Sequence, residues 1–340
     1  MLITLGTPPS DAETDSWYGI AAAAHARDLP ASTPERSRIE TEGKLRVPPV
    51  GARTVHWAWA APDGSYEGIA SLVLPGEAVN RHTASLDTLV VRPDARRRGI
   101  GAALWAAVRA ELVADGRASV STVLEVGGAG EAFVDSLGFT NVLPLGRYVQ
   151  RVRPVLEGIP LPDRPALPAG LRFTDWWGVV PDHLTAAFTR AHEPLSELQR
   201  GRLDGRTPHW DTDRIRAAAR VVEARGGMLL TSAVLDPGAG SGPGSGSGTG
   251  DDIVAFTQVA LAAPGDTRAV QLDTLVVPSH RGRGLGRAVK RHHLERLHEL
   301  LPGVREIGTV VADDNRPMLA VNEALGYRRE RPAGVFQTKL

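Results

Sequence analysis

The 340-residue chain carries 39 basic and 39 acidic residues, so its net charge is zero, and 42% of its residues are hydrophobic. Neutrality argues against a nucleic-acid partner, and the length favours two domains that each bury a core. The absence of cysteine excludes disulfides, thiolate nucleophiles and thiolate metal sites.

The N-terminus, "MLITLGTPPSDAETD", lacks a basic segment followed by an apolar one, so we expect no signal peptide there. No apolar run reaches the length of about 18 residues that a membrane span needs. A cytoplasmic, soluble protein is therefore the expectation.

The first half contains a short motif between predicted elements. The run "LDTLVV" (Leu86–Val91) is strand-like, and "RRRGIG" (Arg96–Gly101) follows it. Helical spacing of Leu104, Val108 and Leu112 then predicts an amphipathic helix. A β-like run and a short helix that ends in "LGF" complete this half.

Two irregular stretches divide the rest of the chain. The proline-rich "EGIPLPDRPALPAG" favours an extended linker, which predicts domains at residues 1–155 and 169–340 joined by a linker at 156–168. The Gly/Ser-rich stretch at 237–250 lies between two β-like runs. It is expected to be a flexible hairpin tip within the second domain.

The second half repeats the order of the first. "LDTLVV" returns at Leu272–Val277 and is followed by "RGRGLG" (Arg281–Gly286), an amphipathic helix, and a strand at Glu306–Ala312. A helix over Asn315–Tyr327 then ends in "LGY". Repetition of the whole order predicts an internal duplication.

A strand that ends in Arg-x-x-Gly-x-Gly and opens a helix is a candidate anion site. The helix N-terminus offers unpaired N–H groups and partial positive charge, glycine permits close approach, and arginine adds charge-assisted hydrogen bonds. Pyrophosphate fits such a loop. Neither copy has the Walker or the Rossmann glycine pattern, and a basic nucleic-acid patch explains the position of the arginines poorly.

Both copies of this motif resemble motif A of the GNAT superfamily of N-acetyltransferases. The preceding "LDTLVV" resembles its fourth strand, and "DSLGF" and "NEALGY" resemble the end of its motif B. The resemblance covers about residues 50–150 and 225–340. It implies an α/β fold of two tandem GNAT domains, each a mixed, mostly antiparallel sheet flanked by helices.

The resemblance also implies acetyl-CoA as the acyl donor, direct attack by an amine on the thioester, and no metal. The fourth strand would pair with the pantetheine arm, and the Gly-rich loop would hold the pyrophosphate. In the second half, these cofactor-binding positions are Val276, Val277, Arg281, Gly282, Arg283, Gly284, Leu285, Gly286 and Asn315. The matching positions of the first half, for which CoA binding stays open, are Val91, Arg96, Arg97, Arg98, Gly99, Ile100 and Gly101.

Motif B distinguishes the two copies. The resemblance implies an Asn and, seven residues later, a Tyr that protonates the departing thiolate. The second half has Asn315 and then Asn322 at these positions, whereas the first half has Gly127 and Val134. We therefore expect the C-terminal half to be catalytic and the N-terminal half to be degenerate. Asn315 also suits a helix N-cap, and one residue could serve both purposes.

The general base is less clearly marked. The family often places Glu where this chain has Ser85 and Gln271. Asp273 lies two residues further on and is the candidate base or amine anchor, because a carboxylate inside an apolar strand is costly unless it is paired or used. A structural hydrogen bond is the alternative, since Asp87 recurs in the other half.

The remaining candidates concern the acid and the acceptor. Tyr327 occupies a core aromatic position of the family and is also the nearest phenol available as an acid. Glu193 and Glu197 lie in the segment expected over the acetyl group and could contact a cationic amine. His293 falls on an apolar helical stripe and is expected to be a core histidine.

The sequence thus favours an acetyl-CoA-dependent N-acetyltransferase that acts on a small amine. A non-catalytic acyl-CoA-binding or sensor protein is the alternative, and an acetyltransferase of the mycothiol-synthase type is a further one. No nucleic-acid or membrane partner is expected, and the chain is expected to be a monomer or a homodimer.

Overall fold

The computed structural model describes residues 1–30, 33, 35–152, 167–197, 201–237 and 251–340. The expected linker at 156–168 and the expected hairpin tip at 237–250 lie almost entirely outside these residues. The chain forms two compact units. Unit 1 comprises Met1–Pro144, Arg200–Pro208 and Pro332–Leu340, and unit 2 comprises Leu145–Gln199 and His209–Arg331.

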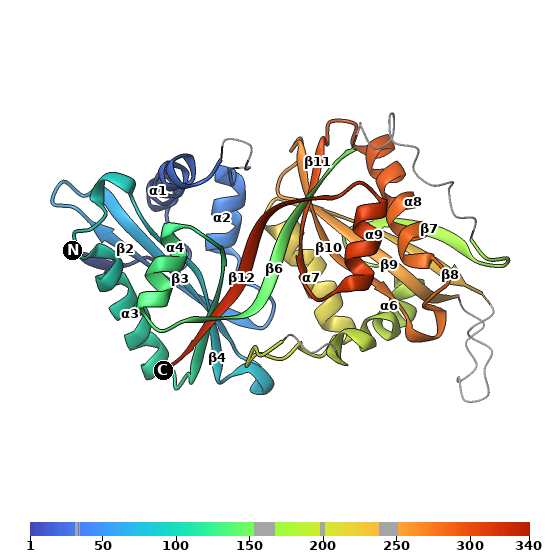
Figure 1. The fold of residues 1–340 in the computed structure, drawn as a ribbon, viewed down its shortest axis with the longest axis horizontal. Helices are drawn as coiled ribbons and strands as arrows, with labels where there is room; N and C mark the ends of the chain where they lie inside the picture. Colours follow the sequence, from blue (N-terminus) through green and yellow to red (C-terminus); the bar gives the residue numbers. More distant parts are fainter. Residues whose placement is uncertain (31–32, 34, 153–166, 198–200, 238–250) are drawn as a thin grey trace. The chain divides into compact units, whose positions relative to one another are not determined.

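The first part of the chain supplies strands and helices in alternation, shown in blue to green in Figure 1. Its strands are β1 (Leu2–Thr4), β2 (Ala52–Ala60), β3 (Tyr66–Pro75), β4 (Thr83–Val91), β5 (Ser119–Glu125) and β6 (Thr140–Arg151). Its helices are α1 (Asp11–Asp28), α2 (Arg38–Arg46), α3 (Ile100–Ala114) and α4 (Ala129–Ser136). Short 3-10 turns, η1 (Ala78–Asn80) and η2 (Pro93–Ala95), flank β4.

The second part repeats this alternation. Its strands are β7 (Arg172–Trp177), β8 (Met228–Asp236), β9 (Asp252–Leu261), β10 (Arg268–Val276), β11 (Glu306–Ala312) and β12 (Arg328–Lys339). Its helices are α6 (Thr185–His192), α7 (Thr212–Ala224), α8 (Leu285–Leu300) and α9 (Arg316–Ala324). The 3-10 turns are η3 (Asp182–Leu184), η4 (Glu193–Glu197) and η6 (Pro278–His280).

Each unit contains a mixed sheet that is mostly antiparallel. In unit 1 the strands follow the order β1-β2-β3-β4-β5, and only β4 and β5 run parallel. In unit 2 the order is β7-β8-β9-β10-β11, and only β10 and β11 run parallel. The predicted fold of two mixed, mostly antiparallel sheets flanked by helices is confirmed.

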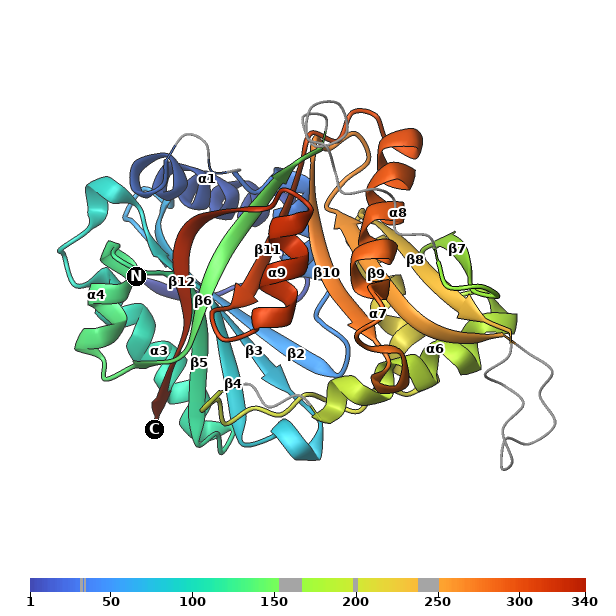
Figure 2. The same ribbon diagram turned by 45° about the vertical axis from the view of Figure 1, so that its right-hand side comes forward.

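A strand from the other half of the sequence completes each sheet. Leu145–Arg151 of β6 pairs antiparallel with β11 in unit 2, where the green strand lies beside orange ones in Figure 1. Ala333–Lys339 of β12 pairs antiparallel with β5 in unit 1, as Figure 2 shows. The units are therefore not contiguous in sequence, whereas the predicted domains 1–155 and 169–340 are single ranges. The difference arises because strands can pair in an order that differs from their order along the chain.

Helices cover both faces of each sheet and bury its apolar side chains. In unit 1, Trp17 of α1 packs with Ile69 on one face, and Leu104 of α3 packs with Leu72 on the other. In unit 2, α6 and α7 pack on one face, with Phe188 against Phe256, and α8 packs on the other. The stripes predicted for α3 and α8 are buried as expected, because helical and strand periodicities both place apolar residues on the shared interface.

Candidate functional site

The Gly-rich loop of unit 2 joins the end of β10 to the start of α8. Gly284 is the N-cap of α8 and has φ 76°, and Gly282 has φ 75°. Only glycine adopts this left-handed conformation without a steric penalty. A Cβ at either glycine would meet no atom within 4 Å, so the loop is open to a ligand. The unpaired N–H groups at the helix start give it the character of an anion site.

Arg281 is anchored at the base of this loop. Its Nε donates a hydrogen bond to the carbonyl oxygen of Val276 at 3.1 Å, and the residue is exposed. The two terminal guanidinium nitrogens make no hydrogen bond or ion pair with any residue that the structure describes. They therefore present a free positive charge beside the helix N-terminus, where a phosphate oxygen would be stabilised.

The loop of unit 1 has the same backbone but a different arginine. Arg96 Nε donates to the Val91 carbonyl oxygen at 3.1 Å, and Gly99 caps α3 with φ 85°. Here the guanidinium also donates to both carboxylate oxygens of Asp28, at 2.7 and 2.6 Å. The positive charge of Arg96 is therefore already paired with a carboxylate, whereas the terminal nitrogens of Arg281 have no such partner among the described residues.

One backbone position also separates the two loops. Arg97 has φ 64°, where the second loop has Gly282. A non-glycine residue in this conformation costs about 1 kcal/mol. The first loop therefore keeps the backbone conformation of the motif, although arginine adopts this conformation less readily than glycine.

The parallel strands of unit 2 separate just before the repeated motif. Pairing of β10 with β11 covers Arg268–Val270 opposite Glu306–Gly308 and then stops. A register shift follows in β10, between Gln271 and Thr274. In unit 1, β4 and β5 separate after Ser85, and a shift between Ser71 and Leu72 of β3 leaves Asp87 of β4 without an opposite residue. In both sheets, pairing between the two parallel strands thus stops at the residue before the repeated "LDTLVV" in unit 1 and two residues before it in unit 2.

Asp273 lies in this irregular segment and is exposed. The cost of placing a carboxylate inside an apolar strand therefore does not apply to Asp273, and its role as base or amine anchor stays a prediction. Its exposed position leaves it accessible to an amine. Asp87 is exposed at the corresponding irregularity of β4.

A buried polar cluster lies next to the point of separation. The Tyr327 hydroxyl donates to Gln271 Oε1 at a long 3.4 Å, and Gln271 Nε2 donates to Thr257 at 2.9 Å. Tyr327 is 1% exposed, and burial raises the pKa of its hydroxyl. The predicted core role of Tyr327 is confirmed, and its hydroxyl faces Gln271 within the core.

Lys290 extends this cluster, and sequence reasoning missed it. Its Nζ donates to Asn322 Oδ1 at 2.7 Å and lies 4.5 Å from the centre of the Tyr327 ring. Burial lowers the pKa of Lys290 to about 7. A lysine one position after Val289 and four before Leu294, both buried, was the available signal.

The other predicted residues take several positions. Asn315 is the N-cap of α9 and its side chain accepts a hydrogen bond from the Met318 N–H at 3.2 Å, so its capping role is confirmed. Glu193 is exposed where α6 meets η4, and the side chain of Glu197 lies outside the described part of the chain. His293 is 1% exposed, which confirms it as a core histidine.

A second histidine, His192, lies in the core beneath α6 and was not singled out from the sequence. Its ring stacks on Phe256 with centroids 4.5 Å apart, and Nδ1 contacts the Phe188 carbonyl oxygen at 2.7 Å. Burial lowers the pKa of His192 to about 4. The imidazole is therefore neutral near pH 7, and its Nδ1–H donates a hydrogen bond to the Phe188 carbonyl oxygen.

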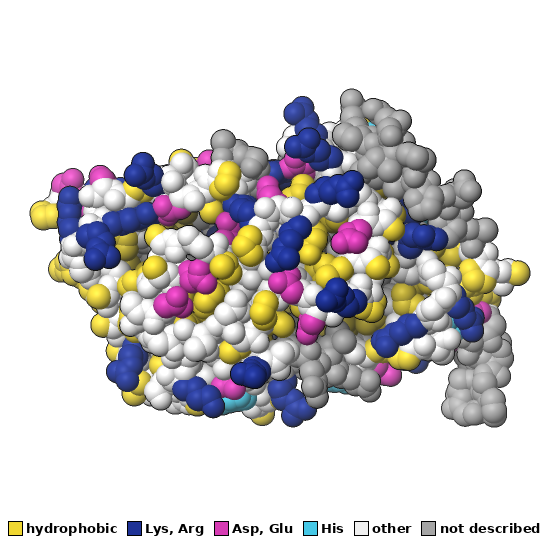
Figure 3. Space-filling model, viewed as in Figure 1, with side chains coloured by type: hydrophobic (Ala, Val, Ile, Leu, Met, Phe, Trp, Pro, Cys, Tyr) yellow, Lys and Arg dark blue, Asp and Glu magenta, His cyan; other side chains and the backbone are white. Residues whose placement is uncertain are grey.

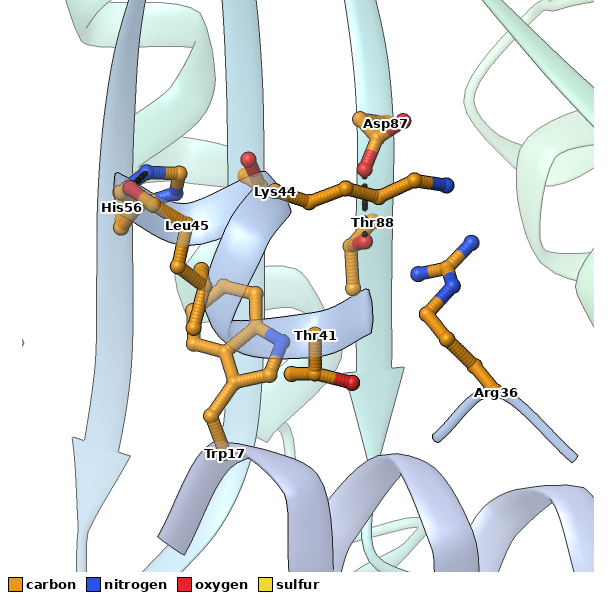
Figure 4. Close-up of a pocket in the computed structure, with 9 residues that line it drawn as sticks. Trp17, Arg36, Thr41, Lys44, Leu45, His56, Asp87 and Thr88 are labelled. Atoms are coloured by element: carbon orange, nitrogen blue, oxygen red, sulfur yellow. Dashed lines mark hydrogen bonds between the residues drawn. The ribbon is translucent and has the colours of Figure 1, made fainter. Parts of the chain in front are cut away.

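Unit 1 contains a pocket between α2 and the sheet, drawn in Figure 4. Lys44 of α2, His56 of β2 and Asp87 of β4 line it, together with Trp17 of α1 and Arg36. Basic, acidic and aromatic side chains thus meet over the irregular segment of β4, in the half expected to be degenerate.

Three further observations concern metal binding, membrane-spanning helices and surface charge. Within the described residues, no group of three or more His, Cys, Asp or Glu side chains is arranged to hold a metal ion. None of the described helices combines the length and apolarity that crossing a bilayer requires. On the face shown in Figure 3, basic and acidic side chains are interspersed.

Comparison with known proteins gives consistent matches. Residues 23–139 and 246–327 match the model of the acetyltransferase (GNAT) family. A mycothiol acetyltransferase from Nocardioides sp. (strain ATCC BAA-499 / JS614) is 29% identical over 321 residues, which cover 89% of this chain and 95% of that protein.

Solved structures share the fold over the whole chain. A tandem GNAT protein from the clavulanic acid biosynthesis pathway superposes with a TM-score of 0.82 at 24% identity, covering 100% of this chain and 98% of that one. A GCN5-related N-acetyltransferase from Sphaerobacter thermophilus superposes with a TM-score of 0.68 at 16% identity, covering 99% and 95%.

Proposed function

Since the chain belongs to the acetyltransferase (GNAT) family, as a tandem member, we propose that it transfers an acetyl group from acetyl-CoA to a small-molecule amine, and that unit 2 performs the reaction. The assignment of the reaction to unit 2 rests on a difference between the two Gly-rich loops. No described residue binds the terminal guanidinium nitrogens of Arg281, whereas Asp28 already binds those of Arg96.

Acetyl-CoA supplies an acyl thioester that an amine can attack without a covalent enzyme intermediate. The loop, which is open at Gly282 and Gly284, and the positive charge of Arg281 would hold its pyrophosphate. The half-buried residues Val276 and Val277, where β10 ends, and the exposed helix start at Asn315 would complete the cofactor site.

The chain's own groups must take one proton and supply another. The attacking nitrogen forms a bond to the acetyl carbon, the bond from that carbon to sulfur breaks, the amine loses a proton and the thiolate gains one. Asp273 is the proposed base or amine anchor because it is exposed at the bulge of β10. Glu193 is a proposed contact for a cationic acceptor, since it is exposed after α6.

The test uses the full chain, acetyl-CoA and a panel of amines, with released CoA as the readout. Arg281→Gln should weaken acetyl-CoA binding by at least about tenfold, because a charge-assisted hydrogen bond contributes roughly 1.5–3 kcal/mol. Arg96→Gln is the matched control and should leave turnover unchanged. Tight acetyl-CoA binding without CoA release for any amine would overturn the proposal and favour the alternative, a non-catalytic acyl-CoA-binding protein.

A second candidate follows from one comparison. The mycothiol acetyltransferase relative spans nearly the same length at 29% identity, so the acceptor of that enzyme belongs in the panel. Preferential turnover of this acceptor over other amines would establish the mycothiol type. Equal or slower turnover would exclude it while leaving the general proposal intact.

A further inference from the structure

The pocket of unit 1 has a polar inner end. His56 is 2% exposed, and its Nε2 lies 3.2 Å from the Leu45 carbonyl oxygen. A carbonyl only accepts, so Nε2 carries the proton and Nδ1 carries a lone pair. Nδ1 is fully buried and has no hydrogen-bond partner among the described residues.

An unpartnered buried acceptor is costly, so this atom is suited to a ligand that brings a donor. Burial lowers the pKa of His56, which keeps the ring neutral and the lone pair available. Trp17 meets the His56 ring edge to face, with centroids 5.6 Å apart, and fixes its orientation.

The opposite end of the pocket carries both signs of charge. Figure 4 shows Lys44, Arg36, Asp87 and Thr88 toward one end and His56 toward the other. Lys44 and Arg36 share one carboxylate, that of Glu40, at 3.4 and 3.2 Å. Burial, and then repulsion by Arg36, lower the pKa of Lys44 despite the attraction of Glu40 and Asp87.

Asp87 complements these cations without being paired to them. Its one hydrogen bond is from the neighbouring Thr88 hydroxyl, at 3.3 Å, and it forms no ion pair with any described residue. At this end, the Asp87 carboxylate is therefore an acceptor that can bind an ammonium. The two cations share a single close carboxylate. Two positive and two negative charges match a ligand that is neutral overall and carries one of each.

We propose that this pocket binds a small amino acid whose side chain carries a hydrogen-bond donor. Its ammonium would bind Asp87, its carboxylate would bind Lys44 and Arg36, and its side-chain donor would reach His56 Nδ1. The space between these residues is about 240 Å³, part of it open to solvent, so only a small molecule fits. This site lies wholly in unit 1, so it stands independently of the transfer proposed for unit 2.

L-Serine and three analogues test each feature by calorimetry on the full chain. Ethanolamine lacks the carboxylate, 3-hydroxypropionate lacks the amine, and L-alanine lacks the hydroxyl. L-Serine should bind with one equivalent, and each analogue should bind at least about tenfold more weakly, which corresponds to 1.4 kcal/mol. No binding of L-serine at about 10 mM, or equal binding of all four compounds, would overturn the proposal.

Variants locate the site. Lys44→Met and Asp87→Asn should each weaken L-serine binding at least about fivefold, and CoA release by unit 2 should stay unchanged. Lys339→Met, at an exposed position of β12, is the matched control. Thermal unfolding confirms that each variant is folded. Binding that survives both pocket substitutions would place L-serine elsewhere and overturn the assignment.

Discussion

Nζ of Lys290 lies 2.7 Å from Oδ1 of Asn322, and the two side chains are 4% and 1% exposed. The pair joins α8 to α9 inside unit 2, and the Tyr327 ring lies beneath the ammonium. Lys290 is buried with an amide and an aromatic ring and forms no ion pair with a carboxylate of the described residues, which gives this unit a stability that depends on pH.

Stability should rise with pH above neutrality. The folded pKa of Lys290 is about 7, below its value in an unfolded chain, so above pH 7 the unfolded chain holds a proton that the folded one has lost. The free energy of unfolding should therefore increase, by up to about 1.4 kcal/mol per pH unit. Urea unfolding between pH 7.5 and pH 9.5 measures the slope. Lys290→Met should remove it, and an unchanged slope would contradict the assignment.

Asn322→Leu should destabilise the protein by about 2–3 kcal/mol, because it removes the hydrogen-bond partner of a buried amine. The double variant Lys290→Met/Asn322→Leu should recover most of this loss, since two apolar side chains then pack together. Urea midpoints of the two single variants and the double variant form a double-mutant cycle. Additive losses would show that the pair is not coupled.

The two N-cap glycines separate folding from binding. Gly284→Ala and Gly99→Ala each force alanine into a left-handed conformation, at a cost of about 1–2 kcal/mol in unfolding free energy. Only Gly284→Ala should also raise the KM for acetyl-CoA. Equal effects of both substitutions on KM would mean that both loops serve the reaction.

Asp28 should control whether the first loop can bind an anion. Asp28→Asn removes the carboxylate that binds Arg96 at 2.7 and 2.6 Å and leaves a guanidinium free beside a helix N-terminus. We expect acetyl-CoA to bind with one equivalent in the native chain and with a second, weaker equivalent in this variant. An unchanged stoichiometry in calorimetry would show that Asp28 is not what closes this loop.

The Tyr327 hydroxyl should contribute little to the rate. Its hydrogen bond to Gln271 is long, 3.4 Å, and the residue is buried in the core. Tyr327→Phe keeps the ring under Lys290, so kcat should change by less than about twofold, since a lost general acid would cost roughly 10²–10⁴-fold. A fall of that size, with native thermal stability, would identify Tyr327 as the acid.

Local sequence patterns were sufficient to predict where the repeated strands and helices lie. Helical spacing located α3 and α8, because this signal depends on neighbours within one or two turns. The mixed, mostly antiparallel character of the two sheets followed from the family resemblance. Strand alternation places Asp273 on the same face as the buried Gln271, yet Asp273 is exposed, since a register shift separates the two residues and a bulge cannot be read from alternation.

Long-range partners could not be predicted. Asp28 reaches Arg96 across 68 positions, and Lys290 reaches Asn322 across 32. A salt bridge to a loop arginine leaves no mark in the loop's own sequence. His56 and Lys44 meet only because α2 lies over β2, so the pocket of unit 1 appears only when the fold is known.

The exchange of β6 and β12 has a consequence for synthesis on the ribosome. The sheet of unit 1 lacks its partner for β5 until residues 333–339 have emerged, although the rest of that sheet is translated more than 200 positions earlier. An exposed β5 edge would persist through translation of the second half, where it could recruit other chains. Cutting the gene at the proline-rich stretch would likewise give two fragments, each with the other's closing strand, and they should become stable only when mixed.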